Sequence, residues 1–171
     1  MSTILRLTRE TLAEGTLALK QADPALGRWI ERVGPVDLRR QRHQFGALCR
    51  SIIAQQLGSG AARAIHRRFV DLFTPAKAPE PAMLLALGAM DLRACGLSRR
   101  KVEFLQSLAR ELLDGSLYRV KLSTLPDEEV IEILTRLPGI GRWTAEMFLI
   151  FSLGRLDVFS VRDLALRTAV E

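Results

Sequence analysis

The sequence predicts an all-α protein, and three observations indicate this class. Leu, Ala and Arg are plentiful while aromatic residues make up only 6% of the 171 residues, a composition typical of helices. Apolar residues recur at helical spacing, as in Val102, Leu105, Leu108 and Leu112. A chain of this length can bury one core, or one core split into two lobes, but hardly two large independent domains. We therefore expect about nine or ten helices and almost no sheet.

The first two predicted helices, 8–21 and 24–33, read as scaffold. Gly15 should interrupt or soften the first, because glycine is a poor helix former. The second has Asp23 as its N-cap and Pro24 at its first position, and Gly34-Pro35 ends it.

The next two predicted helices, 44–57 and 61–73, are separated by Gly58-Ser59-Gly60. Such a glycine-flanked junction ends the first of them. It therefore places Gln55, Gln56 and Leu57 at an exposed helix end, where they can be presented to a partner.

A linker with three prolines covers 75–81, and short helices over 82–89 and 91–95 follow around Gly88. Ser98 then caps a long amphipathic helix over 99–113.

The most informative segment is a helix, hairpin and helix over 127–154. Residues 127–134 begin with acids that suit a helix N-terminus. Pro138 then stops that helix, and Gly139 and Gly141 permit a tight turn with positive φ values before the helix 142–153. Exposed amides at that helix N-terminus suit a phosphate. An ordinary helix-to-helix turn explains the glycine pattern equally well.

The charge of the chain favours a polyanionic partner. Lys and Arg number 25 against 19 Asp and Glu, for a formal net charge of +6. From Leu38 to Val70 there are seven arginines, His43 and His66 but no acid. A solvated face is the simpler explanation of a basic run, but one this long without a counter-charge favours nucleic acid.

Neither a metal site nor a targeting segment is predicted. Cys49 and Cys95 lie far apart in apolar helical contexts, so we expect buried thiols and no iron–sulfur cluster. The N-terminus lacks the apolar core of a signal peptide, and no stretch of about 18 apolar residues occurs. We expect a protein that does not associate with a membrane, in the cytoplasm with the nucleoid if bacterial or in the nucleus if eukaryotic.

Four blocks in order resemble the helix-hairpin-helix (HhH-GPD) DNA glycosylases, in the 3-methyladenine DNA glycosylase II branch. They are SIIAQQLGSGAARAI at 51–65, GLSRRK at 96–101, LPGIGRWTAEMFL at 137–149 and DVFSVRDLALR at 157–167. The resemblance spans roughly 45–167. It implies one domain over 1–171 with two helical lobes that meet near the hairpin and no N-terminal β domain. Relatives continue for some tens of residues, so we expect the C-terminal part of the family domain to be missing.

The resemblance places the catalytic carboxylate at Asp163. Considered alone, this residue reads most simply as the N-cap of a helix beginning at LALR. The two roles are compatible, because amides donating to the carboxylate keep it ionised, as stabilisation of an oxocarbenium-like transition state requires. Many relatives have two adjacent acids here, whereas this chain has Arg162 before Asp163.

Trp143 and Met147 are expected to line the base pocket, although both also fit the core face of their helix. Relatives that also cut the strand carry a lysine nucleophile where Trp143 stands, so a monofunctional glycosylase is predicted. Relatives often have an aromatic residue in place of Met147. An alkylated purine such as 3-methyladenine or 7-methylguanine already carries positive charge, so it can leave without a general acid.

The remaining site residues concern the DNA strand. The resemblance nominates Gln56, with Leu57 as second choice, as the wedge that fills the gap left by a flipped nucleotide. Solvent-facing glutamines at a helix end are the simpler alternative. The phosphate contacts expected are Gly139, Gly141, Arg142, Thr144 and Lys101. Backbone carbonyls of Thr135, Leu137 and Ile140 are expected to hold K⁺ or Na⁺, and no other cofactor is expected.

Double-stranded DNA with alkylated bases, bound by a monomer, is thus the predicted partner and substrate. Three alternatives remain open. A non-catalytic helix-hairpin-helix DNA-binding module would have no use for Asp163. A glycosylase/lyase for oxidised bases would form a covalent adduct with DNA, which Trp143 argues against. An RNA-binding helical domain fits only the charge.

Overall fold

The computed structural model describes residues 7–36, 38–76, 78–114, 117 and 120–170. Within these ranges the chain forms ten α-helices and no strand, which confirms the predicted class. The α-helices are α1 (Arg9–Ala22), α2 (Pro24–Val33), α3 (Gln44–Ala54), α4 (Ser59–Asp71), α5 (Pro81–Ala86), α6 (Ala89–Ala94), α7 (Arg99–Leu113), α8 (Asp127–Thr135), α9 (Arg142–Phe148) and α10 (Leu164–Val170). A 3₁₀ turn, η1 (Leu122–Thr124), precedes α8, and a π-helical segment, η2 (Leu149–Leu153), continues α9.

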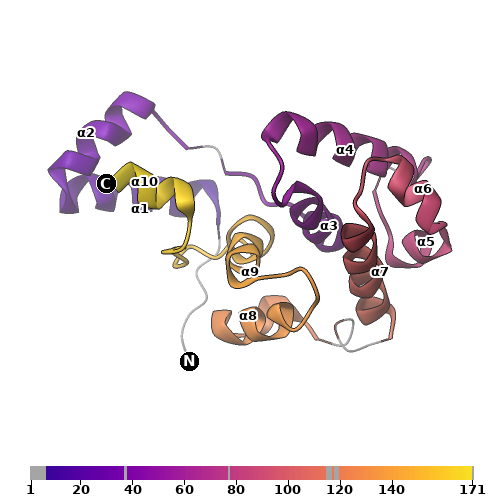
Figure 1. The fold of residues 1–171 in the computed structure, drawn as a ribbon. Coiled ribbons are helices and arrows are strands. Elements are labelled where there is room, and N and C mark those ends of the chain that lie inside the picture. The colour runs from indigo at the N-terminus through magenta and orange to yellow at the C-terminus, as the bar shows by residue number, and fades with distance from the viewer. Residues whose placement is uncertain (1–6, 37, 77, 115–116, 118–119, 171) are drawn as a thin grey trace.

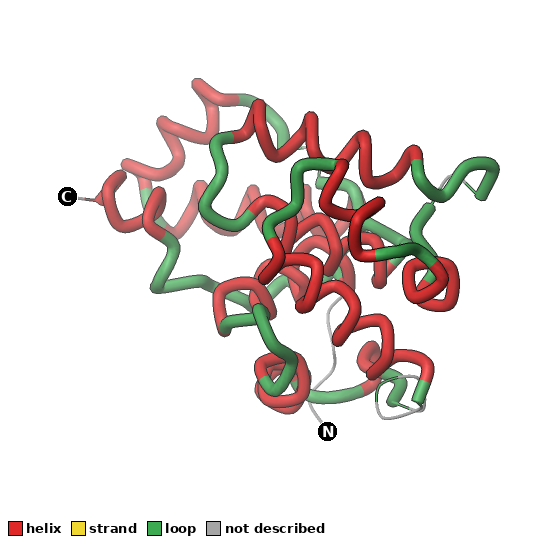
Figure 2. The backbone as a smooth tube through the Cα atoms, turned by 45° about the vertical axis from the view of Figure 1, so that its right-hand side comes forward, coloured by secondary structure: helices red, strands yellow, loops and turns green. Residues whose placement is uncertain are grey.

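The helices fall into two groups. Figure 1 shows α1, α2 and α10 together on one side and α3 to α7 on the other, with α8 and α9 between and below them. The smooth backbone trace in Figure 2 shows how loops join short helices throughout, with no extended sheet-like layer in the described chain. This arrangement agrees with the predicted two lobes.

The core belongs to the larger group. Its fully buried side chains include Ile52 and Ile53 of α3, Phe69 and Phe73 around the end of α4, and Leu105 of α7. The Phe69 and Phe73 rings meet edge to face with centroids 5.1 Å apart. By contrast, α1 has no buried residue and α2 buries only Gly27.

Local signals explain where several helices begin. Asp23 Oδ1 accepts from the amides of Ala25 and Leu26 at 2.8 and 3.1 Å, with Pro24 at the first position of α2, as predicted. Ser98 Oγ accepts from the Lys101 amide at 3.3 Å at the start of α7, again as predicted. These local caps are readable from sequence because donor and acceptor lie within one turn.

Three expectations about local structure are wrong. Helix α1 continues without a break through Gly15. Helix α3 ends at Ala54, before the expected 57, and α4 begins at Ser59, before the expected 61. Of the two hairpin glycines only Gly139 has a positive φ, of 84°, whereas Gly141 has φ −92° and ψ 172° as the N-cap of α9.

Candidate active site and nucleic-acid interface

Asp163 lies in the turn that begins α10, directly beside α9. Its Oδ1 accepts from the Leu166 amide at 3.0 Å, and its Oδ2 accepts from Trp143 Nε1 at 2.8 Å. These donors, the Leu166 amide first and the indole second, lower the pKa of the Asp163 carboxyl. The helix-cap role is therefore present, and it leaves the carboxylate ionised and partly exposed.

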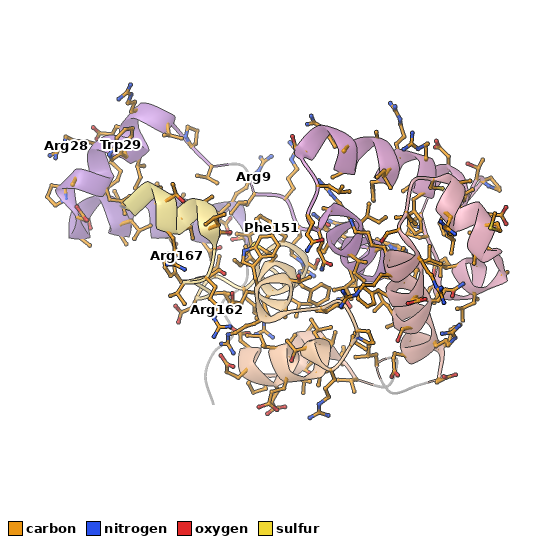
Figure 3. The ribbon with its side chains drawn as sticks, in the orientation of Figure 1. Arg9, Arg28, Trp29, Phe151, Arg162 and Arg167 are labelled. Carbon is orange, nitrogen blue, oxygen red and sulfur yellow. The ribbon has the colours of Figure 1, made fainter. Side chains whose placement is uncertain are left out.

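An open hollow of about 880 Å³ lies in front of this carboxylate. Its lining residues are Trp143, Arg162, Asp163, Leu164, Ala165, Thr168 and Ala169. Trp143 is 44% exposed, so much of its indole ring faces solvent while the ring N–H is held by Asp163. Figure 3 labels Arg162 and Arg167, which come from the turn before α10 and from α10 itself. The lining of the hollow thus combines one carboxylate, one aromatic ring and one arginine, Arg162.

Met147 lies one turn beyond Trp143 on α9 and is half-buried. It is not among the residues that line the hollow. Its role in a base pocket therefore stays a prediction.

The hairpin depends on Gly139 for its shape. Its φ of +84° favours glycine, and a Cβ placed there would lie 2.2 Å from Phe104 Cδ2 of α7. At Gly141 a Cβ would meet no atom within 4 Å. The first glycine is required by packing, while the second leaves open space in front of the α9 N-terminus, where first-turn amides have no intrahelical acceptor.

A second cleft of about 810 Å³ separates the hairpin from α7 and from the end of α3. Its lining residues are Gln55, Gln56, Ser98, Arg100, Lys101, Phe104, 135–141 and Trp143. Trp143 therefore borders both hollows. The predicted phosphate-binding glycines and the predicted wedge meet in this cleft, although they are more than eighty residues apart in the chain.

Gln56 and Leu57 project from the loop between α3 and α4. Both are exposed, and Gln56 has a left-handed backbone with φ 57°, which is rare outside glycine. Gln55 holds the loop from inside, because its Nε2 donates to the Gly139 carbonyl at 2.7 Å. Projection beside the hairpin is the geometry that a wedge needs, and the wedge role itself stays a prediction.

Two of the predicted phosphate contacts, Arg142 and Thr144, have side chains that interact within the protein. Arg142 binds Glu128 with both terminal nitrogens, at 2.9 and 2.5 Å, and donates from Nε to Glu146 at 3.0 Å. Thr144 is buried, so its side chain does not face a strand. Acids of α8 and α9 therefore pair with the Arg142 side chain, and the core encloses the Thr144 side chain, while the phosphate contacts of both residues stay a prediction.

The Lys101 side chain also interacts within the protein, and its predicted phosphate contact stays a prediction. Its ammonium donates to the carbonyls of Ile53 and Gln55 at 2.7 Å each, and burial lowers its pKa. It therefore caps the C-terminus of α3 from the neighbouring helix α7. Two exposed cations that the sequence analysis did not nominate, Arg100 and Arg136, also line the cleft. The Arg100 guanidinium carbon lies 5.4 Å from the centroid of the Phe104 ring.

The two cysteines are free, buried thiols, as expected, and burial raises the pKa of each. In the described part of the chain no group of three His, Cys, Asp or Glu side chains could hold a metal ion. No helix in those ranges is long and apolar enough to cross a bilayer.

Comparison with known proteins decides the family. Residues 49–171 match the model of the HhH-GPD superfamily of base excision DNA repair proteins. The chain belongs to this superfamily. The DNA-3-methyladenine glycosylase 1 of Schizosaccharomyces pombe is 36% identical over 161 residues, which cover 92% of this chain and 71% of that protein. The resemblance drawn from the four sequence blocks is thereby confirmed.

Solved HhH-GPD structures have the same fold. A DNA-3-methyladenine glycosidase from Bacillus halodurans is 40% identical, with a TM-score of 0.76, over 86% of this chain and 68% of that one. The S. pombe glycosylase Mag1 in complex with abasic DNA is 34% identical, with a TM-score of 0.79, over 92% of this chain and 78% of that one. The second of these superfamily members was solved with abasic DNA bound.

Proposed function

We propose that this HhH-GPD protein is a monofunctional DNA glycosylase that removes alkylated bases of the 3-methyladenine and 7-methylguanine type in base excision repair. Relatives named as DNA-3-methyladenine glycosylases support this class of reaction. The observation that carries the proposal is the Asp163 carboxylate, kept ionised by two donors at the edge of a hollow beside an exposed indole.

The reaction follows from those groups. A base flipped out of the duplex would enter the hollow and lie against Trp143, whose ring attracts a cationic purine. The N-glycosidic bond breaks with its electron pair going to the base, which leaves as a neutral molecule. Positive charge then develops at C1′ and the sugar oxygen, and Asp163 stabilises it. A water oxygen bonds to C1′, its proton passes to Asp163 or to solvent, and an abasic site remains.

The cleft beside the hairpin would hold the strand. The open backbone in front of Gly141 suits close approach of a phosphate, and Arg100 supplies a cation there. Gln56 and Leu57 would enter the duplex as the wedge. We also propose a K⁺ or Na⁺ at the carbonyls of Thr135, Leu137 and Ile140, residues that all line this cleft. The Leu137 carbonyl already accepts from the Ile140 amide at 3.1 Å, so it would offer its second lone pair.

Replacing Asp163 by Asn tests the reaction. Release of 3-methyladenine from methylated duplex DNA should be lost, while binding to a duplex with a tetrahydrofuran abasic analogue should persist. Asp157→Asn is the matched control, since that carboxylate is exposed in the same connecting segment and should be dispensable. Unchanged release by Asp163→Asn would favour a non-catalytic DNA-binding module. Trapping of a covalent adduct with borohydride would instead favour a glycosylase/lyase.

A further inference from the structure

A buried carboxylate lies one helical turn from Trp143. Glu146 of α9 is only 5% exposed, and its sequence neighbour Ala145 is fully buried. A carboxylate is costly to bury unless it is hydrogen-bonded. Its Oε1 accepts from Arg142 Nε at 3.0 Å, and its Oε2 accepts from Ser160 Oγ at 2.6 Å. Both oxygens are therefore engaged, and one of them reaches out of the helix to a distant segment.

That segment is the turn carrying Asp163. Ser160 is 2% exposed, and its carbonyl accepts from the Asp163 amide at 3.0 Å. Residues 160–163 thus form a β-turn with Ser160 as its first residue and Asp163 as its last. The position of the Ser160 side chain accordingly helps to set the position of the Asp163 backbone.

Helix α9 holds both ends of this turn. Side chains three residues apart lie on the same face of a helix. From that face, Trp143 donates to the Asp163 carboxylate at 2.8 Å and Glu146 accepts from Ser160 at 2.6 Å. The indole contact is solvent-accessible, while the Glu146 to Ser160 contact is enclosed by protein. The enclosed contact is the one that water competes with least.

The contact extends to a third element. Arg142, which shares the Glu146 carboxylate, also binds Glu128 of α8 with two hydrogen bonds. One Glu146 oxygen therefore accepts from an arginine that is itself ion-paired, and the other oxygen accepts from Ser160. Arg142 offsets the desolvation energy of the buried Glu146 charge, so the turn is not destabilised by an unpaired carboxylate.

We propose that Glu146 and Ser160 are a positioning pair that fixes the catalytic turn and aims the Asp163 carboxylate at the deoxyribose. The inference rests on the proposed function, because it takes Asp163 as the group that stabilises the transition state. Neither member of the pair lines the hollow, so both act through Asp163. Displacement of a catalytic group by about 1 Å can cost about 100-fold in rate.

Four substitutions in the full chain separate positioning from general stability. Ser160→Ala removes the donor, and Glu146→Met removes the acceptor while keeping the length of the side chain. Glu146→Gln keeps an amide oxygen that can accept from Ser160. Ser152→Ala is the matched control, because Ser152 is equally buried and no hydrogen bond from its side chain to the turn occurs among the described residues.

The readouts are the single-turnover rate of 7-methylguanine release from an oligonucleotide duplex, the affinity for a tetrahydrofuran-containing duplex, and the melting temperature. Ser160→Ala and Glu146→Met should lower the rate by about 10-fold to about 100-fold. Their affinity for the abasic analogue should stay within about twofold, because hairpin and wedge are untouched. Glu146→Gln should recover most of the rate, and Ser152→Ala should keep it.

A readout independent of turnover is Trp143 fluorescence in a Trp29→Phe background. Acid titration of that signal reports protonation of Asp163 through the indole hydrogen bond. Ser160→Ala should shift this titration toward higher pH, because a displaced carboxylate loses part of the Trp143 contact that lowers its pKa. If Glu146→Met does not fold, the rate, affinity and titration of Ser160→Ala alone test the positioning pair.

The outcomes distinguish the two proposals. An active wild-type protein, an inactive Asp163→Asn variant and a Ser160→Ala variant with unchanged rate and titration would overturn the positioning pair. Equal losses of rate and of DNA affinity in Ser160→Ala would also overturn it, because they indicate general disorder of the site. A wild-type protein that releases no alkylated base would overturn the proposed function, and the fluorescence titration would still test the positioning pair.

Discussion

Asp163 combines a structural and a chemical property in one side chain. The Leu166 amide and the Trp143 indole both donate to it, and both favour the ionised form. The second donor is also the ring expected to face the substrate base. Binding of a base and ionisation of the acid are consequently linked through one indole.

Trp143→Phe should therefore move the acid limb of the activity profile. The lowered pKa means that the carboxylate persists to lower pH than a free aspartate, and loss of the indole donor raises the pKa toward its ordinary value. Activity should then fall away at a higher pH than in the wild type. Single-turnover rates from about pH 4 to about pH 8 measure this shift. An unmoved acid limb would show that the indole bond does not tune Asp163.

Lys101 should contribute to stability by capping α3. Lys101→Met removes two hydrogen bonds from an ammonium to the carbonyls of Ile53 and Gln55. A loss of about 2 kcal/mol in the free energy of unfolding is expected, since hydrogen bonds to charged groups are the stronger kind. Urea denaturation measures it, with exposed Lys121→Met as control. Equal stability of the two variants would contradict the capping role.

The role of a side chain was predictable from sequence only in two cases. Either its hydrogen-bond partner lies close to it in the chain, or the residue falls in a motif that resembles the family. The N-cap role of Asp163 follows from residues within one turn of it. The pairing of Arg142 with Glu128 and the capping by Lys101 depend on α8 and α3 lying beside those side chains, and no local pattern reports that. Adjacent cations such as Arg100 and Lys101 look alike in sequence, and both line the cleft, yet the Lys101 ammonium is bound to carbonyls at the end of α3 while Arg100 stacks on the Phe104 ring.

The hairpin shows two glycines with different duties. Gly139 has a positive φ and abuts Phe104, while Gly141 faces open space. In the sequence motif both positions are simply glycine, so the motif does not distinguish their roles. Only the backbone angles and the neighbouring ring distinguish a residue needed for folding from one needed for approach of a ligand.

Gly139→Ala and Gly141→Ala should thus fail in different ways. The first should lower stability by at least about 1 kcal/mol, because of its positive φ, and by more if the Phe104 ring cannot move. The second should fold normally and bind a duplex more weakly, because its methyl group occupies the space in front of the helix amides. Thermal melting and binding to an abasic-analogue duplex separate the two. Two equally unstable variants would contradict this division.

Helix identity was predictable throughout, whereas helix ends were less so. Amphipathic spacing and local caps locate α2 and α7 closely. The early end of α3 depends on Lys101 from another helix, and the change from α9 to the π-helical η2 leaves no mark in the spacing of apolar residues. Long-range contacts determine these two boundaries.

The surplus of Lys and Arg suits a DNA-binding protein and should appear as salt dependence. Arg100→Gln should reduce the slope of log affinity against log salt concentration by about one, as expected for the loss of one phosphate contact. Arg99→Gln is the control, since Arg99 pairs with Glu103 at 3.0 Å and does not line the cleft. Titrations of a fluorescent duplex at several salt concentrations measure the slope. Equal slopes for both variants would remove Arg100 from the interface.

The division into two groups of helices agrees with the expected fold. The two lobes were predicted from the family resemblance and not from composition. Composition predicted only helices and one core. The weak burial in α1 and α2 could not be foreseen, since their apolar residues read as ordinary helix faces; Leu17, Trp29 and Val33 are 57%, 60% and 76% exposed. Exposure depends on which neighbours are present.

A single hydrogen bond joins the two parts of the molecule expected to handle a DNA strand. Gln55 Nε2 donates to the Gly139 carbonyl at 2.7 Å, so the tip beside Gln56 and the glycine turn are braced against each other. The acceptor is a backbone carbonyl, which a hairpin of another sequence also has, so the brace depends on the glutamine side chain at position 55. Chimaeras in which the segment between α3 and α4 is exchanged should accordingly keep a glutamine at this position, so that the hairpin stays anchored to it.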